Sequence, residues 1–170
     1  MFQYRVTKYD PRFRDASGVY LRDDWTMISQ MGRTLEGVKL TPQLYLAVEN
    51  AYVEAAIAFL TEASVETLMI RGLEKSREYC NSALKLEEGA NCCMLEVADI
   101  ARLILRESIW CRLEGENTYL HFGWDYYMYI GVSTECAKSI EYAKDRGLFV
   151  EQCESPYRKQ PTIETFKTVY

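Results

Sequence analysis

The stretch Ile109–Val132, IWCRLEGENTYLHFGWDYYMYIGV, decides the fold class. Apolar and aromatic residues dominate Ile109–Leu113 and Thr118–Val132, and the turn-forming residues Glu114-Gly115-Glu116-Asn117 separate the two runs. Two strand-like runs joined by so short a link predict an antiparallel hairpin. A purely parallel sheet is disfavoured, because parallel neighbours need long crossover connections.

Helical patterns flank this hairpin on both sides. The most regular one starts at Thr41-Pro42, where threonine can cap free backbone amides and proline fits the first helical position. Apolar residues then recur at three- and four-residue steps as far as Glu62, which predicts a helix with one stripe on the core. That stripe comprises Leu44, Ala47, Val48, Ala51, Tyr52, Ala55 and Phe59. Related patterns predict helices over Glu74–Leu84, Asn91–Glu107 and Ser133–Arg146.

Three further strands are predicted, over Phe2–Tyr9, Thr67–Arg71 and Leu148–Cys153. Turn formers make Pro11–Trp25 a long ordered loop, followed by a short helical turn over Thr26–Met31 and an extended piece over Leu35–Leu40. Helices separate some strands and hairpins separate others, so we expect an α+β fold, a mixed or mainly antiparallel sheet with helices packed on it. Residues 1–170 are expected to form a single domain with a loosely ordered tail over about 156–170.

Composition and charge narrow the function classes. The chain is 48% hydrophobic and 26% charged, as is usual for globular proteins. Its 25 acidic and 20 basic residues give a net charge of −5, the wrong sign for direct nucleic-acid binding. The longest apolar run, Ala55–Leu60, is too short to cross a bilayer, and the first residues lack the apolar segment of a signal peptide. We therefore expect a cytoplasmic protein that does not bind membranes.

Motifs for metals and cofactors are missing from the sequence. None of the six cysteines is spaced as C-x-x-C, and His121 is the single histidine, so we expect no metal site. No glycine-rich phosphate loop occurs, so we expect no nucleotide cofactor. The cysteines are expected to be reduced. Cys92-Cys93 leaves two interpretations open, a redox pair or small buried apolar residues, and the second is commoner.

The segment Tyr119–Ile130 has the most unusual composition in the chain. If it is one strand, alternation places Trp124 and other apolar residues on a core face and a polar-aromatic set on the opposite face. That second set contains Tyr119, His121, Asp125, Tyr127 and Tyr129. It predicts either a protein-recognition surface or tyrosines that cover the sheet beneath a helix. His121 and Asp125 would lie about 13 Å apart, too far for a dyad, whereas a site pairing His121 with a distant cysteine stays open.

Acidic residues gather beside the predicted loops and turns, at Asp23-Asp24 next to Trp25 and at Glu114 and Glu116 in the hairpin turn. Scattered surface acids usually serve solvation. An acidic surface with exposed aromatics can also steer onto a basic nuclease and block its active site. These residues therefore join the polar-aromatic set as candidate partner contacts.

Two parts of the sequence resemble a known class of proteins. They are Tyr4–Pro11 running through Gly18–Tyr20 to Asp23–Thr26, and His121–Tyr129. Together they are similar to small acidic bacterial immunity proteins of polymorphic-toxin and contact-dependent growth inhibition systems. Such proteins share no single fold, so the resemblance implies a function class alone.

The resemblance implies a non-enzymatic protein that binds and neutralises a cognate toxin domain in the cytoplasm without a cofactor. We expect the toxin to be a basic nuclease. Two alternatives stay open, a non-catalytic regulatory or protein-binding module and, third, an enzyme with an unrecognised site. The expected partner-binding residues are Asp23, Asp24, Trp25, Glu114, Glu116, Tyr119, His121, Asp125, Tyr127 and Tyr129.

Overall fold

An antiparallel sheet forms the body of the molecule in the computed structural model, which describes residues 1–77, 79, 84 and 86–159. Its seven described strands lie in the order β5-β4-β6-β7-β8-β1-β9, and every neighbouring pair is antiparallel. The strands are β1 (Phe2–Thr7), β4 (Thr67–Lys75), β5 (Asn91–Cys93), β6 (Ile109–Gly115), β7 (Thr118–Phe122), β8 (Met128–Val132) and β9 (Phe149–Gln152). The predicted hairpin is confirmed as β6–β7, with Gly115 paired to Thr118.

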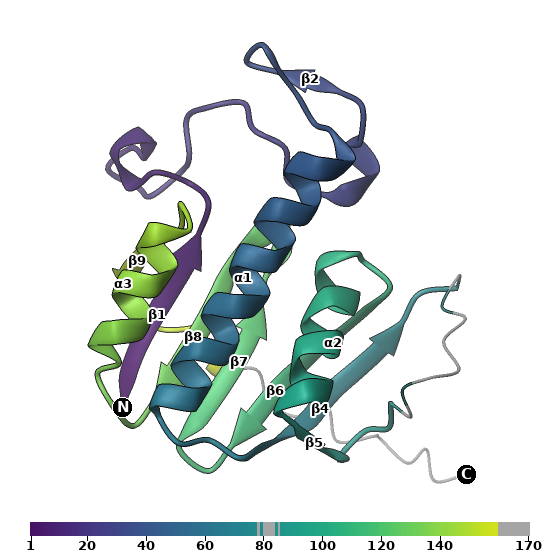
Figure 1. Cartoon of the computed structure of the whole chain (residues 1–170), viewed down its shortest axis with the longest axis vertical. Helices are drawn as coiled ribbons and strands as arrows, with labels where there is room; N and C mark the ends of the chain where they lie inside the picture. Colours follow the sequence, from purple (N-terminus) through teal and green to yellow (C-terminus); the bar gives the residue numbers. More distant parts are fainter. Residues whose placement is uncertain (78, 80–83, 85, 160–170) are drawn as a thin grey trace, which may run out of the picture.

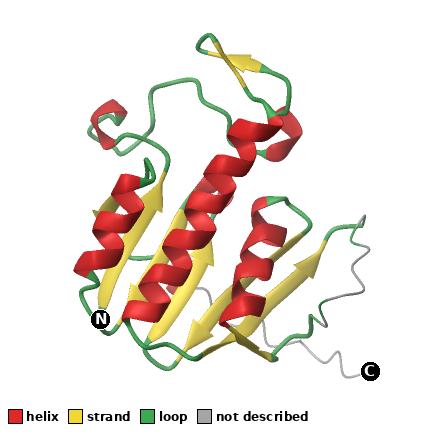
Figure 2. Ribbon diagram, viewed as in Figure 1, coloured by secondary structure: helices red, strands yellow, loops and turns green. Residues whose placement is uncertain are grey.

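Three helices, α1 (Pro42–Glu62), α2 (Met94–Leu105) and α3 (Ala137–Asp145), lie together on one face of this sheet, with α1 between the other two (Figure 1). Figure 2 shows the two layers, helices over strands. The predicted start of α1 is confirmed, since the Thr41 hydroxyl accepts a hydrogen bond from the Leu44 amide at 3.2 Å. The chain is therefore an α+β domain with an antiparallel sheet.

The core lies between the helices and the sheet. Phe59 of α1 and Leu120 of β7 are fully buried there. The predicted stripe on α1 is correct at Ala51, Tyr52, Ala55 and Phe59, but Ala47 is exposed. The buried face is wider than one stripe and includes Val53 and Leu60, because α1 is flanked by a helix on each side. Helix α1 is long and apolar enough to cross a membrane by length and composition alone. A helix in a protein core can meet the same criterion, and half of the most apolar 18-residue window of α1 is buried in this fold.

Three helix predictions need correction. Asn91–Cys93 form strand β5 and pair with β4 rather than start a helix, so α2 begins at Met94. Glu74 and Lys75 continue strand β4 rather than start a helix, because they pair with Trp110 and Ile109 of β6. The rest of the predicted Glu74–Leu84 helix falls largely outside the described residues. Helix α3 starts at Ala137, with Cys136 as its N-cap, rather than at Ser133.

The connection between β1 and α1, residues 8–41, forms an arm that extends past the end of the sheet (Figure 1). It contains two short 3-10 turns, η1 (Pro11–Phe13) and η2 (Ile28–Gln30), and a small hairpin of β2 (Thr34–Leu35) and β3 (Val38–Lys39). The predicted loop and helical turn are confirmed, whereas the predicted extended piece over Leu35–Leu40 reverses direction at Glu36-Gly37 and forms the hairpin. After β9 the chain enters the 3-10 turn η4 (Pro156–Lys159), and residues 160–170 lie outside the described part.

Candidate functional site

The connection between β7 and β8 is a tight turn rather than the predicted continuous strand. Residues Trp124–Tyr126 form the 3-10 turn η3, and the Gly123 amide donates to the Tyr127 carbonyl at 2.7 Å. Asp125 and Tyr126 both have φ of 61°, in the left-handed region that residues other than glycine rarely adopt. Because the alternation stops here, Trp124 is 80% exposed instead of facing the core.

Tyr126 holds this turn in place. Its hydroxyl donates to the Leu105 carbonyl at 3.2 Å, and its ring lies 4.9 Å from that of Trp25. The Tyr52 hydroxyl donates to the Tyr126 carbonyl at 2.7 Å. Burial raises the pKa of the Tyr126 hydroxyl, so it stays protonated at neutral pH. These hydrogen bonds and this ring contact hold the turn in its unfavourable left-handed backbone conformation.

A cavity of about 250 Å³ lies beside the turn, between the end of β4, the segment from α2 to β6, and η3. Its aromatic wall includes Trp110, Phe122 and Trp124, and its carboxylates are Glu74, Glu107 and Asp125. All three carboxylate residues are exposed, and within the described chain none has an ion pair or side-chain hydrogen bond. The cavity is therefore an acidic, aromatic site with unused hydrogen-bond acceptors.

Lys75 also lines the cavity but forms no ion pair with these carboxylates in the described structure, so three carboxylates face one ammonium group. Its ammonium group donates to the Leu86 carbonyl at 3.0 Å and lies 5.5 Å from the centre of the Tyr79 ring. Leu86 is not part of the lining. The site consequently favours positively charged ligands.

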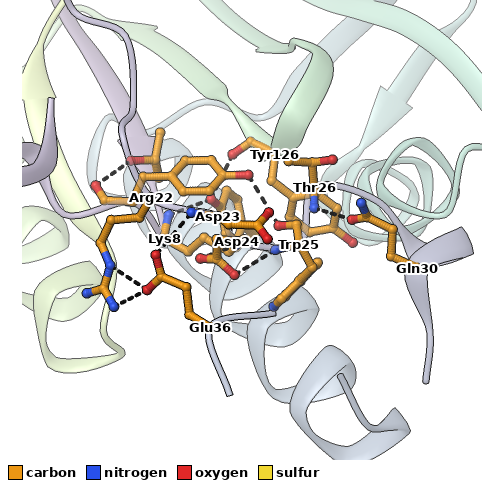
Figure 3. A network of polar contacts seen from close by, with 12 residues as sticks. Lys8, Arg22, Asp23, Asp24, Trp25, Thr26, Gln30, Glu36 and Tyr126 are labelled. Atoms are coloured by element: carbon orange, nitrogen blue, oxygen red, sulfur yellow. Dashed lines mark hydrogen bonds and ion pairs between the residues drawn. The ribbon is translucent and has the colours of Figure 1, made fainter. Parts of the chain in front are cut away.

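The arm residues predicted to contact a partner, Asp23, Asp24 and Trp25, lie at this same end of the sheet, and Figure 3 shows the network around them. Trp25 is buried against Tyr126. An oxygen of Asp24 lies 2.6 Å from the Lys8 ammonium group. The expectation that Trp25 is exposed is therefore wrong, because it anchors the arm. Asp23 is exposed.

Lys8 is the buried cation of this network. Its ammonium group lies 4.3 Å from the centres of both the Tyr9 and the Trp25 rings. Burial lowers the pKa of Lys8 to about 8, although Asp24 acts in the opposite direction. Asp24 is thus engaged in an internal ion pair.

The polar-aromatic set on β7 and β8 is buried on the face of the sheet opposite the helices. Tyr119, His121 and Tyr129 are 3%, 0% and 9% exposed. Segment 155–159 covers them, with the Tyr157 ring centre 6.2 Å from those of both His121 and Tyr129. The expectation of an exposed recognition face is wrong at these three positions, and the cover is this C-terminal segment rather than a helix.

His121 fastens that segment. Its Nδ1 lies 2.8 Å from the Ser155 hydroxyl, and its Nε2 lies 3.3 Å from a Glu114 oxygen. Burial, with Arg112 and Arg158 nearby, lowers the His121 pKa to about 3, so the ring is neutral at pH 7. Ser155 is only 2% exposed and also accepts from the Tyr157 amide at 3.2 Å. The hydrogen bond between Ser155 and His121 therefore attaches the C-terminal segment to β7.

The other predicted contacts are dispersed. Glu114 also pairs with Arg112 at 3.3 Å, and the half-buried Tyr127 accepts a hydrogen bond from Arg14 at 2.7 Å. Glu116 is exposed in the β6–β7 turn, at the opposite end of β7 from Asp125. The structure thus brings Asp125 and the arm residues together, and separates them from Glu116.

Sequence reasoning missed Trp124, Glu74 and Glu107 as site residues. Strand alternation extended through the turn predicts a core position for Trp124, which is wrong. The flanking Gly123 and Asp125 are turn formers and could have indicated the break. Glu74 and Glu107 come from segments far apart in the sequence, and no local pattern joins them.

A second hollow, an open groove of about 640 Å³, runs along the outer side of α1 between α2 and α3. Its acids already have partners. Glu54 pairs with Arg146 at 2.6 Å, and Glu62 accepts from the Ser139 hydroxyl at 2.6 Å. The groove consequently lacks the unused acceptors of the cavity beside Trp124.

The described cysteines are free thiols, and Cys80 lies outside the described residues. Burial raises the pKa of Cys92 and Cys136 to about 11 and that of Cys111 to about 12, so these thiols stay protonated at neutral pH. Exposed Cys93 and buried Cys92 occupy opposite faces of β5. Among the described residues, no group of three or more histidine, cysteine or acidic side chains is placed to hold a metal ion.

No family model matches the chain, and no curated protein or solved structure matches it significantly. The resemblance to immunity proteins therefore stays a prediction from the sequence.

Proposed function

We propose that this protein is an immunity protein, which binds a basic toxin domain in the cytoplasm and blocks it without catalysis. The observation that carries the proposal is Trp124, 80% exposed beside three carboxylates that have no partner in the described chain. Tryptophan is enriched among the few residues that dominate the energy of protein interfaces. An exposed tryptophan within an acidic rim suits a partner with a positively charged surface.

The charge distribution supports fast association with such a partner. The whole chain carries a net charge of −5. Unpaired acids around the contact residue would attract a basic surface and raise the association rate, an effect that salt weakens. Desolvation of Trp124 would then control how long the complex lasts.

The chemistry of the buried groups weighs against the enzymatic alternative. Cys92, Cys111 and Cys136 are protonated at neutral pH, which makes them poor nucleophiles. His121 is fully buried beneath the C-terminal segment, and Ser155, which belongs to that segment, is 2% exposed. A regulatory protein-binding module would use the same surface, and a toxin-rescue assay separates it from an immunity protein.

The test is to express each open reading frame neighbouring this gene, alone and with this protein. We expect one product to be toxic alone, to be rescued by this protein and to co-purify with it. Trp124→Ala should shorten the lifetime of that complex at least tenfold. Leu95→Ala is the matched control, because Leu95 is 81% exposed at the start of α2 and away from the cavity.

Two outcomes would contradict the proposal. The function is wrong if no neighbouring product is toxic or co-purifies, or if the isolated protein converts a metabolite. The site is wrong if rescue occurs and the two variants bind the toxin alike.

A further inference from the structure

We infer that the cavity beside Trp124 binds the guanidinium group of an arginine side chain, presented by the basic partner that the proposed function requires. The inference rests on the proposed function for the source of the arginine alone. The chemistry of the site is argued from the cavity itself, and the test uses the isolated protein.

The size of the cavity fits one long side chain. Its volume of about 250 Å³ lies below the roughly 300–1,000 Å³ of clefts that bury drug-sized ligands. Ile104, Leu105 and Ile109 provide an apolar lining. Arginine buries its aliphatic stem along such surface while its charged head stays at a polar rim.

The charges fit a cation with several donors. Glu74 is the penultimate residue of β4, Glu107 follows α2 and Asp125 lies in η3, so three separate segments place carboxylates around one cavity. None of the three has an ionic partner among the described residues, and they outnumber Lys75, the ammonium group in the lining, which donates to the Leu86 carbonyl. A guanidinium group has five N–H donors in a planar fork and can bind two carboxylates at once, which an ammonium group does less well.

The aromatic wall favours the same ligand. Guanidinium groups stack on aromatic faces, and tryptophan is the strongest partner for a cation. Trp110 and Tyr126 are already held in place, the first by donating from its indole to the Phe122 carbonyl at 3.1 Å and the second by its bond to Leu105. Because these walls are fixed before binding, little conformational entropy is lost when the side chain enters.

The test compares N-acetylarginine amide with N-acetylcitrulline amide, which has the same shape but a neutral urea group. Binding is followed by NMR at the indole N–H groups of Trp110 and Trp124 and at the Gly123 amide. We expect saturable shifts with the arginine compound, and about tenfold weaker binding of both the citrulline compound and N-acetyllysine amide.

Two charge-matched variants locate the site. The triple variant Glu74→Gln, Glu107→Gln, Asp125→Asn should lose arginine binding, and asparagine tolerates the left-handed backbone at position 125. The control removes the same charge from exposed acids that do not line the cavity, by Glu66→Gln, Glu141→Gln and Asp145→Asn, and should bind as the unmodified protein does.

The inference is overturned if citrulline or lysine binds as tightly as arginine, if the two triple variants weaken binding equally, or if the shifts occur away from the cavity. It stands independently of toxin rescue. If no toxin is found but arginine binds as expected, the site is correct and the immunity function fails. If a toxin is rescued but arginine does not bind the cavity, the function survives and this site fails.

Discussion

Replacing Lys8 by methionine should remove a buried charge and change how stability depends on pH. The Lys8 side chain is 7% exposed and sits between two aromatic rings. Burial lowers its pKa from 10.5 to about 8 even though Asp24 lies 2.6 Å away. The folded protein therefore keeps a proton on Lys8 less readily than the unfolded chain does.

The size and sign of the effect follow from this shift. At roughly 1.4 kcal/mol per pKa unit, keeping Lys8 charged costs the folded state about 3 kcal/mol at neutral pH. Between pH 8 and 10.5 the unfolded chain holds more protons at this position, so the contribution of Lys8 to stability rises with pH. Methionine does not titrate, so the stability advantage of Lys8→Met should shrink by about 2–3 kcal/mol between pH 7 and pH 10.

The measurement is urea denaturation of both proteins at pH 7 and at pH 10, followed by tryptophan fluorescence. The quantity to compare is the difference in free energy of unfolding between the two proteins at each pH. The raised pKa values of buried cysteines such as Cys111 lower the stability of both proteins at high pH, so this effect cancels in the difference. Comparing this difference at pH 7 and pH 10 also separates the titration of Lys8 from the loss of its two cation–π contacts, which costs about 1–2 kcal/mol at either pH. Lys39→Met is the matched control, because it makes the same substitution at an exposed position on β3 without removing a buried charge. A constant difference for Lys8→Met would refute the reasoning.

Three further predictions concern the core and the thiols. Phe59→Ala should lower the free energy of unfolding by about 3–5 kcal/mol, since the ring is fully buried, and an unchanged urea midpoint would remove α1 from the core. Gly131→Ala should cost about 1–3 kcal/mol, because a Cβ there would clash with the Tyr119 ring, and an unchanged melting temperature would contradict this packing. Iodoacetamide followed by mass spectrometry should find exposed Cys93 modified in the folded protein and buried Cys111 modified only after unfolding, so native labelling of Cys111 would show that its burial is wrong.

The parts of the fold that the sequence predicted correctly are those governed by local rules. Thr41-Pro42 caps α1, and the turn Glu114–Asn117 closes the β6–β7 hairpin, because a cap and a turn each depend on a few adjacent residues. Position 74 follows a different rule. Glu74 pairs with Trp110, a partner distant in the sequence, and this contact overrides a weak helical pattern.

The site was harder to predict for the same reason. Aromatic residues continue through the chain reversal at η3, so composition alone did not separate β7 from β8. Trp25 stands beside two acids and suggested a surface loop, whereas its burial depends on Tyr126 and Lys8, which come from other elements. Trp124 is exposed and Trp25 is buried because of tertiary contacts, which no local sequence pattern encodes.

The buried network and the cavity are connected through Tyr126. Trp25 packs on its ring and so holds the arm, including the Thr26 edge of the cavity, against the end of the sheet. The hydroxyl of Tyr126 fixes the turn that carries Asp125. A buried lysine and two consecutive left-handed residues both lower stability, and such features persist where surrounding contacts over-determine them, commonly at binding sites. These features lie together at one end of the sheet. This favours that end as the binding surface, because a rigid surface loses little conformational entropy on binding.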